Sequence, residues 1–275
     1  MKPFIREKKI QAGANYREAD LIMATDRRAN GRRQKKQNIS RPAQRNLNDE
    51  NSKRYFVQLA EANFGAEDWA VELSYFAEPD DLDAADRDLH HFIARLRYLC
   101  RKRGLPPLKW LAVTSDISPA TGRPARVHHH LFVSGVLSFD DIRNAWRQPR
   151  RKGEKQGRFI GRVNLDRLIP DQDFNISGKA HYFGRQTGSR RKRWRGALHL
   201  TKPVRLPDND HRYSRRQIER LALAAPYPAW GKDVEALPHA DFWRKQYPGW
   251  RVVSYQPRYN DFSGWAIYLK MRRVE

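Results

Sequence analysis

The segment from Val127 to Val133 (VHHHLFV) places the strongest constraint on the fold of this chain. Its apolar and β-branched residues favour a strand, in which successive side chains point to opposite faces. His128 and His130 then share one face. His129 shares the other face with the aliphatic residues of the segment and points toward the expected core. The sequence therefore predicts a sheet that displays a pair of histidines on one face.

A histidine pair of this kind suits a divalent metal ion, because imidazole nitrogens are good ligands and two of them leave positions for a carboxylate, water and a substrate oxygen. Asp116, at the end of the preceding strand, and Glu72, on the polar face of another strand, are the candidate third ligands. Because this ligand set contains no cysteine, it favours Mg²⁺ or Mn²⁺ over structural zinc. The alternatives are two surface histidines and an aspartate that begins a turn.

The formal net charge of +23 indicates a polyanionic partner, with nucleic acid favoured over an acidic membrane surface. Cys100 is the single cysteine, so no internal disulfide and no multi-thiolate site can form. The sequence contains no apolar run of about 18 residues, and its first residues lack the apolar stretch of a secretory signal. We therefore expect a cytoplasmic protein with no membrane partner.

The order of expected elements predicts an α+β fold with a central antiparallel sheet and flanking helices, covered on one face. We expect residues 1–46 to form a basic, flexible arm that either wraps DNA or is solvated, because residues 26–45 contain few apolar side chains. We expect residues 47–205 to form the main domain and residues 206–275 to form an extension packed on it. The main elements expected are helices at 48–62, 80–103, 140–146, 177–186 and 215–225, and strands at 69–76, 110–114, 126–134 and 159–165.

The segment GKAHYFGRQ offers a nucleophile and a phosphate ligand on one expected helix. Tyr182 and Arg185 are three residues apart and so share a helical face. A tyrosine there can attack phosphorus while the guanidinium holds the phosphate. By itself the pattern is weak, because the chain has 11 tyrosines and most of them should serve packing.

Residues 143–205 hold 18 Lys and Arg residues and four Asp and Glu residues, a net charge of +14 around the expected nucleophile. The alternative is a solvated charged face. A mixture of cations and an aromatic ring suits contacts to the backbone and bases of a single strand. The residues expected to bind DNA are Arg147, Arg150, Arg151, Lys152, Lys155, Arg158, Lys179, Arg190, Arg191, Lys192, Arg193, Trp194, Arg195 and Lys202.

The stretch GRPARVHHHLFVSG resembles the second motif of the HUH endonucleases, and residues 46–273 resemble the rolling-circle replication-associated proteins of bacterial plasmids, phages and integrative elements. Supporting segments are LKWLAVTSD, LIPDQDFNISGKAHYFGRQ and RWRGALHLTKP. The resemblance implies an HUH endonuclease-like fold. It implies that His128 and His130 hold Mg²⁺ or Mn²⁺, and that Tyr182 forms a 5′-phosphotyrosine and leaves a 3′-OH for the host polymerase.

Two residues depart from the family pattern. Arg185 replaces the lysine of the family's Tyr-x-x-Lys helix, and guanidinium does not donate a proton. The family's acidic residue corresponds to Ser115, with Asp116 one place later. Because a slip of one residue changes the face of a strand, either the strand is bulged or Asp116 is not the third ligand.

The expected partners are single-stranded or origin DNA, a host helicase and a host polymerase. Two other functions remain open from sequence. A conjugative relaxase or a transposase uses the same chemistry. A non-catalytic nucleic-acid-binding protein that retains the fold is favoured by the two departures.

Overall fold

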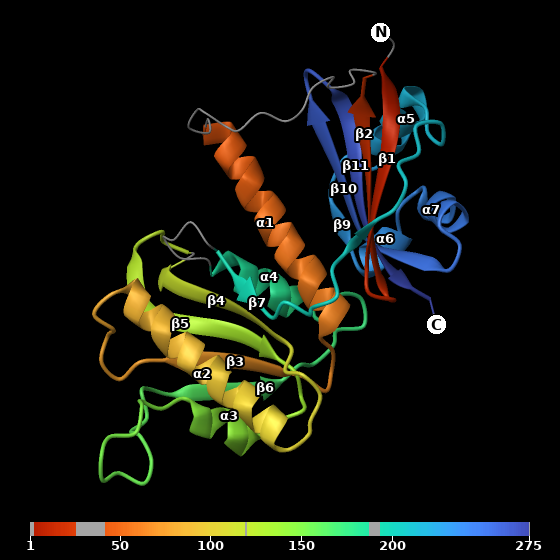
Figure 1. Ribbon diagram of the computed structural model, residues 1–275. Helices are drawn as coiled ribbons and strands as arrows, with labels where there is room; N and C mark the ends of the chain where they lie inside the picture. Colours follow the sequence, from red (N-terminus) through yellow and green to blue (C-terminus); the bar gives the residue numbers. More distant parts are fainter. Residues whose placement is uncertain (1–2, 26–41, 119, 187–192, 275) are drawn as a thin grey trace, which may run out of the picture. The chain divides into compact units, whose positions relative to one another are not determined.

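The computed structural model describes residues 3–25, 42–118, 120–186 and 193–274 (Figure 1). The chain divides into two compact units. The central unit comprises Glu50–Asp171 and Asn175–Thr201, and the terminal unit comprises Met1–Asp49, Gln172–Phe174 and Lys202–Glu275. The fold is α+β, and each unit contains its own antiparallel sheet.

The central unit is built on a five-stranded sheet in the order β6-β3-β5-β4-β7. Every pairing in it is antiparallel, as expected for the central sheet, and the strands expected at 110–114 and 126–134 pair with each other. The histidine-bearing strand β5 lies in the middle of this sheet. The strands are β3 (Trp69–Ser74), β4 (Trp110–Ile117), β5 (Pro124–Val133), β6 (Val163–Arg167) and β7 (Arg195–Gly196).

Helices cover both faces of the central sheet, rather than the one face that we expected (Figure 1). On one face α2 (Leu82–Lys102) and α3 (Phe139–Ala145) form a core with Leu131 and Val133. On the other face α1 (Pro42–Asn63) and α4 (Ser177–Arg185) form a second core with Phe132. The continuous apolar run Leu131-Phe132-Val133 explains the difference, because a strand that is apolar at successive positions buries both faces.

The terminal unit contains a six-stranded sheet in the order β8-β1-β2-β11-β10-β9. Its short helices α5 (Arg215–Ala224), α6 (Lys232–Glu235) and α7 (Ala240–Gln246) form one hydrophobic core with the sheet, which includes Ile218, Trp243 and Leu269. The strands are β1 (Phe4–Ala12), β2 (Tyr16–Ala24), β8 (Val204–Arg205), β9 (Ala229–Trp230), β10 (Trp250–Asn260) and β11 (Gly264–Arg273).

The expected flexible arm over residues 1–46 is wrong for residues 4–24, which form the β1–β2 hairpin. Apolar residues in these strands are buried against the helices, among them Ile5 and Leu21. Gly13, with φ of 64°, allows the tight turn between them. The basic stretch 26–41 lies outside the described residues. Residues 206–275, expected to extend the main domain, instead share a sheet with this hairpin, since β11 pairs with β2.

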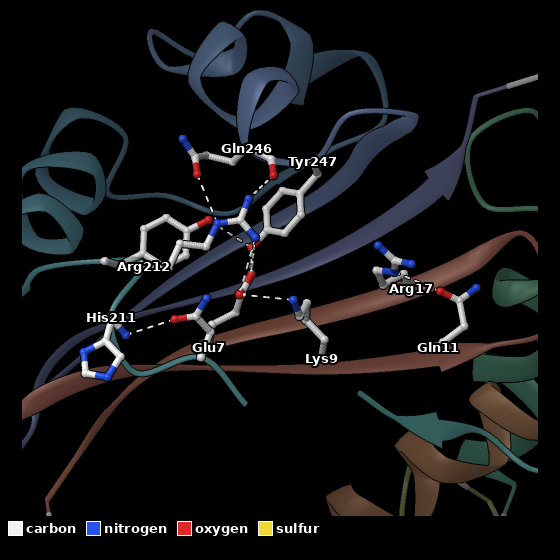
Figure 2. A network of polar contacts seen from close by, with 10 residues as sticks. Glu7, Lys9, Gln11, Arg17, His211, Arg212, Gln246 and Tyr247 are labelled. Atoms are coloured by element: carbon white, nitrogen blue, oxygen red, sulfur yellow. Dashed lines mark hydrogen bonds and ion pairs between the residues drawn. The ribbon is translucent and has the colours of Figure 1, made fainter. Parts of the chain in front are cut away.

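Glu7 of β1 is fully buried and lies at the centre of a polar network (Figure 2). The Tyr247 hydroxyl donates to its carboxylate at 2.7 Å, and Arg212 donates at 3.2 Å. The Lys9 amine lies 3.4 Å away. Arg212 also donates to the side-chain and main-chain oxygens of Gln246. The network therefore fastens the first strand to the segment before α5 and to the end of α7.

None of the helices in the described ranges has both the length and the apolar character that a membrane span requires.

We predict that Glu7→Ala lowers the free energy of unfolding by about 3–5 kcal/mol, because it leaves the Arg212 charge without its buried carboxylate. Urea unfolding followed by tryptophan fluorescence measures the change. The control is Asp241→Ala, which breaks an exposed ion pair to Arg244 and should cost less than about 1 kcal/mol. Equal losses in the two variants contradict a structural role for the Glu7 network.

Candidate active site

The three histidines of β5 alternate between the two faces of the sheet as predicted. His129 is fully buried on the α2 face, where its ring nitrogens form 2.9 Å hydrogen bonds with Tyr75 and Thr114. His128 and His130 lie together on the other face, with ring centroids 4.8 Å apart. His129 is thus a core residue, whereas His128 and His130 form a pair on the opposite face.

His130 is buried without a hydrogen bond at either ring nitrogen to any described residue. Its ring centroid lies 4.9 Å from that of Phe183 and 5.5 Å from that of Tyr182, both on α4. Burial, and then the nearby charges of His128 and Lys179, lower the pKa of His130 to about 3. The ring is therefore neutral at physiological pH, which is the form that binds metal ions.

His128 has one ring nitrogen fixed by the main chain. Its Nδ1 lies 2.8 Å from the carbonyl oxygen of Arg126, which can only accept, so Nδ1 carries the hydrogen. This hydrogen bond fixes the tautomer and leaves the lone pair of Nε2 for a ligand.

The β4–β5 pairing is irregular next to His128. Ser115 is opposite His128, whereas Ile117 is opposite Pro124, so that Asp116 alone faces residues 125–127 of β5. This bulge contains Arg126, whose carbonyl holds His128. A bulge was one of the two outcomes predicted for this region, and bulges commonly re-aim side chains near functional sites.

The two candidate carboxylates differ in their position relative to the histidines. Glu72 of β3 is directly opposite His130, and directly opposed residues of neighbouring strands share a face. With His128 and Arg162, Glu72 also lines a pocket of about 490 Å³. On β4 the residue in register with His128 is Ser115, and Asp116 follows it in the irregular stretch. Glu72 is therefore the better-placed carboxylate.

The described residues contain no group of three His, Cys, Asp or Glu side chains arranged to hold a metal ion. The structure thus brings together the predicted histidine pair, with Glu72 on the same face of the sheet. It does not gather the four predicted ligands into one cluster.

Tyr182 is about half exposed on α4, directly beside the histidine pair. The helix is held there by Ala180 and Phe183, which are buried in the core with α1. Gly184 also faces α1, where its Cα side lies against Phe56. Packing of one helical face therefore holds Tyr182 next to His130 while the residue remains about half exposed.

The predicted cation Arg185 is exposed in the last turn of α4. Lys179, which we expected only to bind DNA, acts electrostatically on His130 and lies 5.8 Å from the Phe183 ring. Sequence reasoning missed both Phe183, which packs on His130, and this role of Lys179. The signal available was helical spacing, since positions 179, 182 and 183 are neighbours on a helix surface.

Several of the predicted DNA-binding side chains make contacts within the central unit. Arg147 donates to Gly157 and Asn144 and covers the Phe159 ring at 3.6 Å. Arg195 forms a bidentate ion pair with Asp86. In contrast, the loop after α3 exposes Arg150, Arg151, Lys152, Lys155 and Arg158, and Lys202 is exposed in the terminal unit.

Trp194 packs against Tyr55, with ring centroids 5.8 Å apart, and donates to Ser52. Its ring is thus a packing residue at the edge of the α1 face. Arg193 interacts with other residues of the chain. Arg190, Arg191 and Lys192 lie outside the described residues.

Comparison of the chain with protein-family models, with curated protein sequences and with solved structures finds no match.

We predict that, in EDTA, the stability of the protein falls as pH falls from about 6.5 toward 3. The unfolded His130 ring takes a proton near pH 6.5, whereas the folded ring stays neutral to about pH 3, so the unfolded state binds more protons in this window. His130→Leu should therefore lose less thermal stability between pH 7 and pH 5 than the wild type. An equal loss in both proteins contradicts a neutral buried His130.

Proposed function

We propose that this protein cleaves single-stranded DNA through Tyr182, as a rolling-circle replication nickase of the HUH type. One observation carries the proposal. A buried and neutral His130, whose ring forms no hydrogen bond with any described residue, lies beside both His128 and the half-exposed Tyr182, on one face of an antiparallel sheet. This is a metal-ligand pair beside a nucleophile, in a chain with a net charge of +23.

The residues of the site fit a divalent cation with mixed nitrogen and oxygen ligands, Mn²⁺ or Mg²⁺. His130 has ring nitrogens without hydrogen bonds, His128 has Nε2 available, and Glu72 faces the same side. Two or three protein ligands leave positions for water and a phosphate oxygen. When bound, such an ion draws electron density from a phosphate oxygen and stabilises the charge that develops at phosphorus.

The chain's own residues perform the covalent step. The Tyr182 oxygen attacks phosphorus, and the bond between phosphorus and the 3′ oxygen breaks. The tyrosine hydroxyl gives its proton to solvent, and the departing 3′ oxygen takes one up. The products are a 5′-phosphotyrosine and a free 3′-OH, which a host polymerase can extend. Lys179 and Arg185, on either side of Tyr182 along α4, hold the phosphate.

Conjugative relaxases and transposases use the same chemistry, and the DNA context of the substrate distinguishes them from a replication nickase. A non-catalytic nucleic-acid-binding protein is the second candidate function. The observation that favours it is the lack of a three-ligand group among the described residues. The two candidates differ in one product, the covalent protein–DNA adduct.

Incubation with single-stranded origin DNA and Mn²⁺ should give a covalent adduct on a denaturing gel, and Tyr182→Phe should give none. The matched control is Tyr227→Phe, which alters another exposed tyrosine and should retain the adduct. His128→Ala with His130→Ala should abolish it. An adduct that persists in Tyr182→Phe contradicts the proposal, as does a wild-type protein that forms none with its own origin.

We predict that Lys179→Ala slows single-turnover nicking by about 10-fold to 100-fold relative to the wild type. Arg185→Ala should slow it less. The range follows from the loss of one charged hydrogen bond, about 1.5–3 kcal/mol. The physical reason is that Lys179 is the cation whose charge reaches His130. A larger loss in Arg185→Ala contradicts this assignment.

A further inference from the structure

The central unit carries two adjoining pockets on the α2 side of its sheet, away from the histidine pair. One has a volume of about 380 Å³ and is lined by Arg87, His90 and Arg195, among others. The other has a volume of about 350 Å³ and includes Arg101 and His199. Arg97 and Trp110 line both pockets, which therefore form one continuous depression. We call it the α2 groove.

The groove is basic. His90, Arg97 and Arg101 follow one another at helical spacing along α2, and all are exposed. Within the described part of the chain, no carboxylate forms an ion pair with Arg97 or Arg101, whereas the charge of Arg87 acts on the neighbouring carboxylate of Asp88. The one acidic residue that lines the groove, Asp86, is already bound by Arg195. The charges of Arg97 and Arg101 thus remain for an anionic ligand.

The groove also has an apolar wall. Trp110, at the start of β4, is half-buried and borders both pockets. Leu198, in the turn that follows β7, is 99% exposed and lines the second pocket. Proteins that bind single-stranded nucleic acids combine aromatic side chains with a cationic groove. The bases stack on the aromatic rings, and the phosphates contact the cations.

The edge strand β7 connects this groove with the face that carries Tyr182. Trp194, just before β7, packs on Tyr55 of α1, whereas Arg195 turns to Asp86 of α2. The two sheet faces therefore meet along this edge. From Arg87 to Arg101 the groove follows α2 for about 21 Å, at 1.5 Å per residue.

We propose that the α2 groove binds single-stranded DNA, and that it holds a part of the strand distant from the scissile phosphate. The identification of the strand as DNA rests on the proposed function. Arg97 and Arg101 bind consecutive phosphates, and a base lies against Trp110. The groove thereby supplies affinity that does not depend on the metal or on Tyr182.

The test measures the affinity for a fluorescent oligothymidylate of about 20 nucleotides at several salt concentrations, in EDTA. Loss of two phosphate contacts in Arg97→Ala/Arg101→Ala should reduce the slope of log K against log salt by about 1.4, at about 0.7 for each contact. The control, Arg215→Ala/Arg216→Ala on α5, removes the same charge from exposed positions and should leave the slope unchanged. Thermal unfolding verifies that both double variants fold.

A slope in Arg97→Ala/Arg101→Ala that equals the wild-type or the control value overturns the inference. Binding of oligouridylate through these arginines with no binding of oligothymidylate also overturns it, in favour of RNA. The two proposals fail separately. An adduct that forms normally while the slope is unaffected refutes the groove alone, whereas a groove-dependent slope with no adduct refutes the nickase alone.

Discussion

The candidate site depends on His130 of β5, which is buried against α4 and whose ring nitrogens form no hydrogen bond with any described residue. A buried polar group without a partner costs about 1–3 kcal/mol, so a native fold that keeps one needs a reason for it. Aromatic packing from Phe183 and Phe132 holds the surrounding face together. A metal ion would bind the ring-nitrogen lone pair of His130 that no described residue uses, which gives a functional reason for this buried histidine.

The rest of the site follows from the positions of the neighbouring elements. Register with β3 puts Glu72 opposite His130, and the bulge against β4 lets the Arg126 carbonyl fix His128. The packing of α4 on α1 sets Tyr182 beside the pair. On the opposite face His129 is satisfied by Tyr75 and Thr114, so the same strand contributes one histidine to the core and two to the site.

Much of this site could be predicted from sequence, because strand alternation is a local property. It assigned His128 and His130 to one face and His129 to the other, and helical spacing put Tyr182 and Arg185 on one face of a helix. The β1–β2 hairpin was missed because the basic segment that follows it dominated the composition of residues 1–46. The bulge at Asp116 was left as one of two alternatives. The packing of Trp194 and Arg195 could not be predicted, because it depends on contacts between residues distant in the sequence.

In the proposed site, His128 and His130 together bind a divalent cation through their ring nitrogens. Pulsed electron paramagnetic resonance of the Mn²⁺-loaded protein counts the imidazole nitrogens coupled to the metal. We expect two such nitrogens in the wild type, one in His128→Ala and none in His128→Ala/His130→Ala. Bound Mn²⁺ without nitrogen coupling in the wild type, or coupling that persists in the double variant, would contradict it.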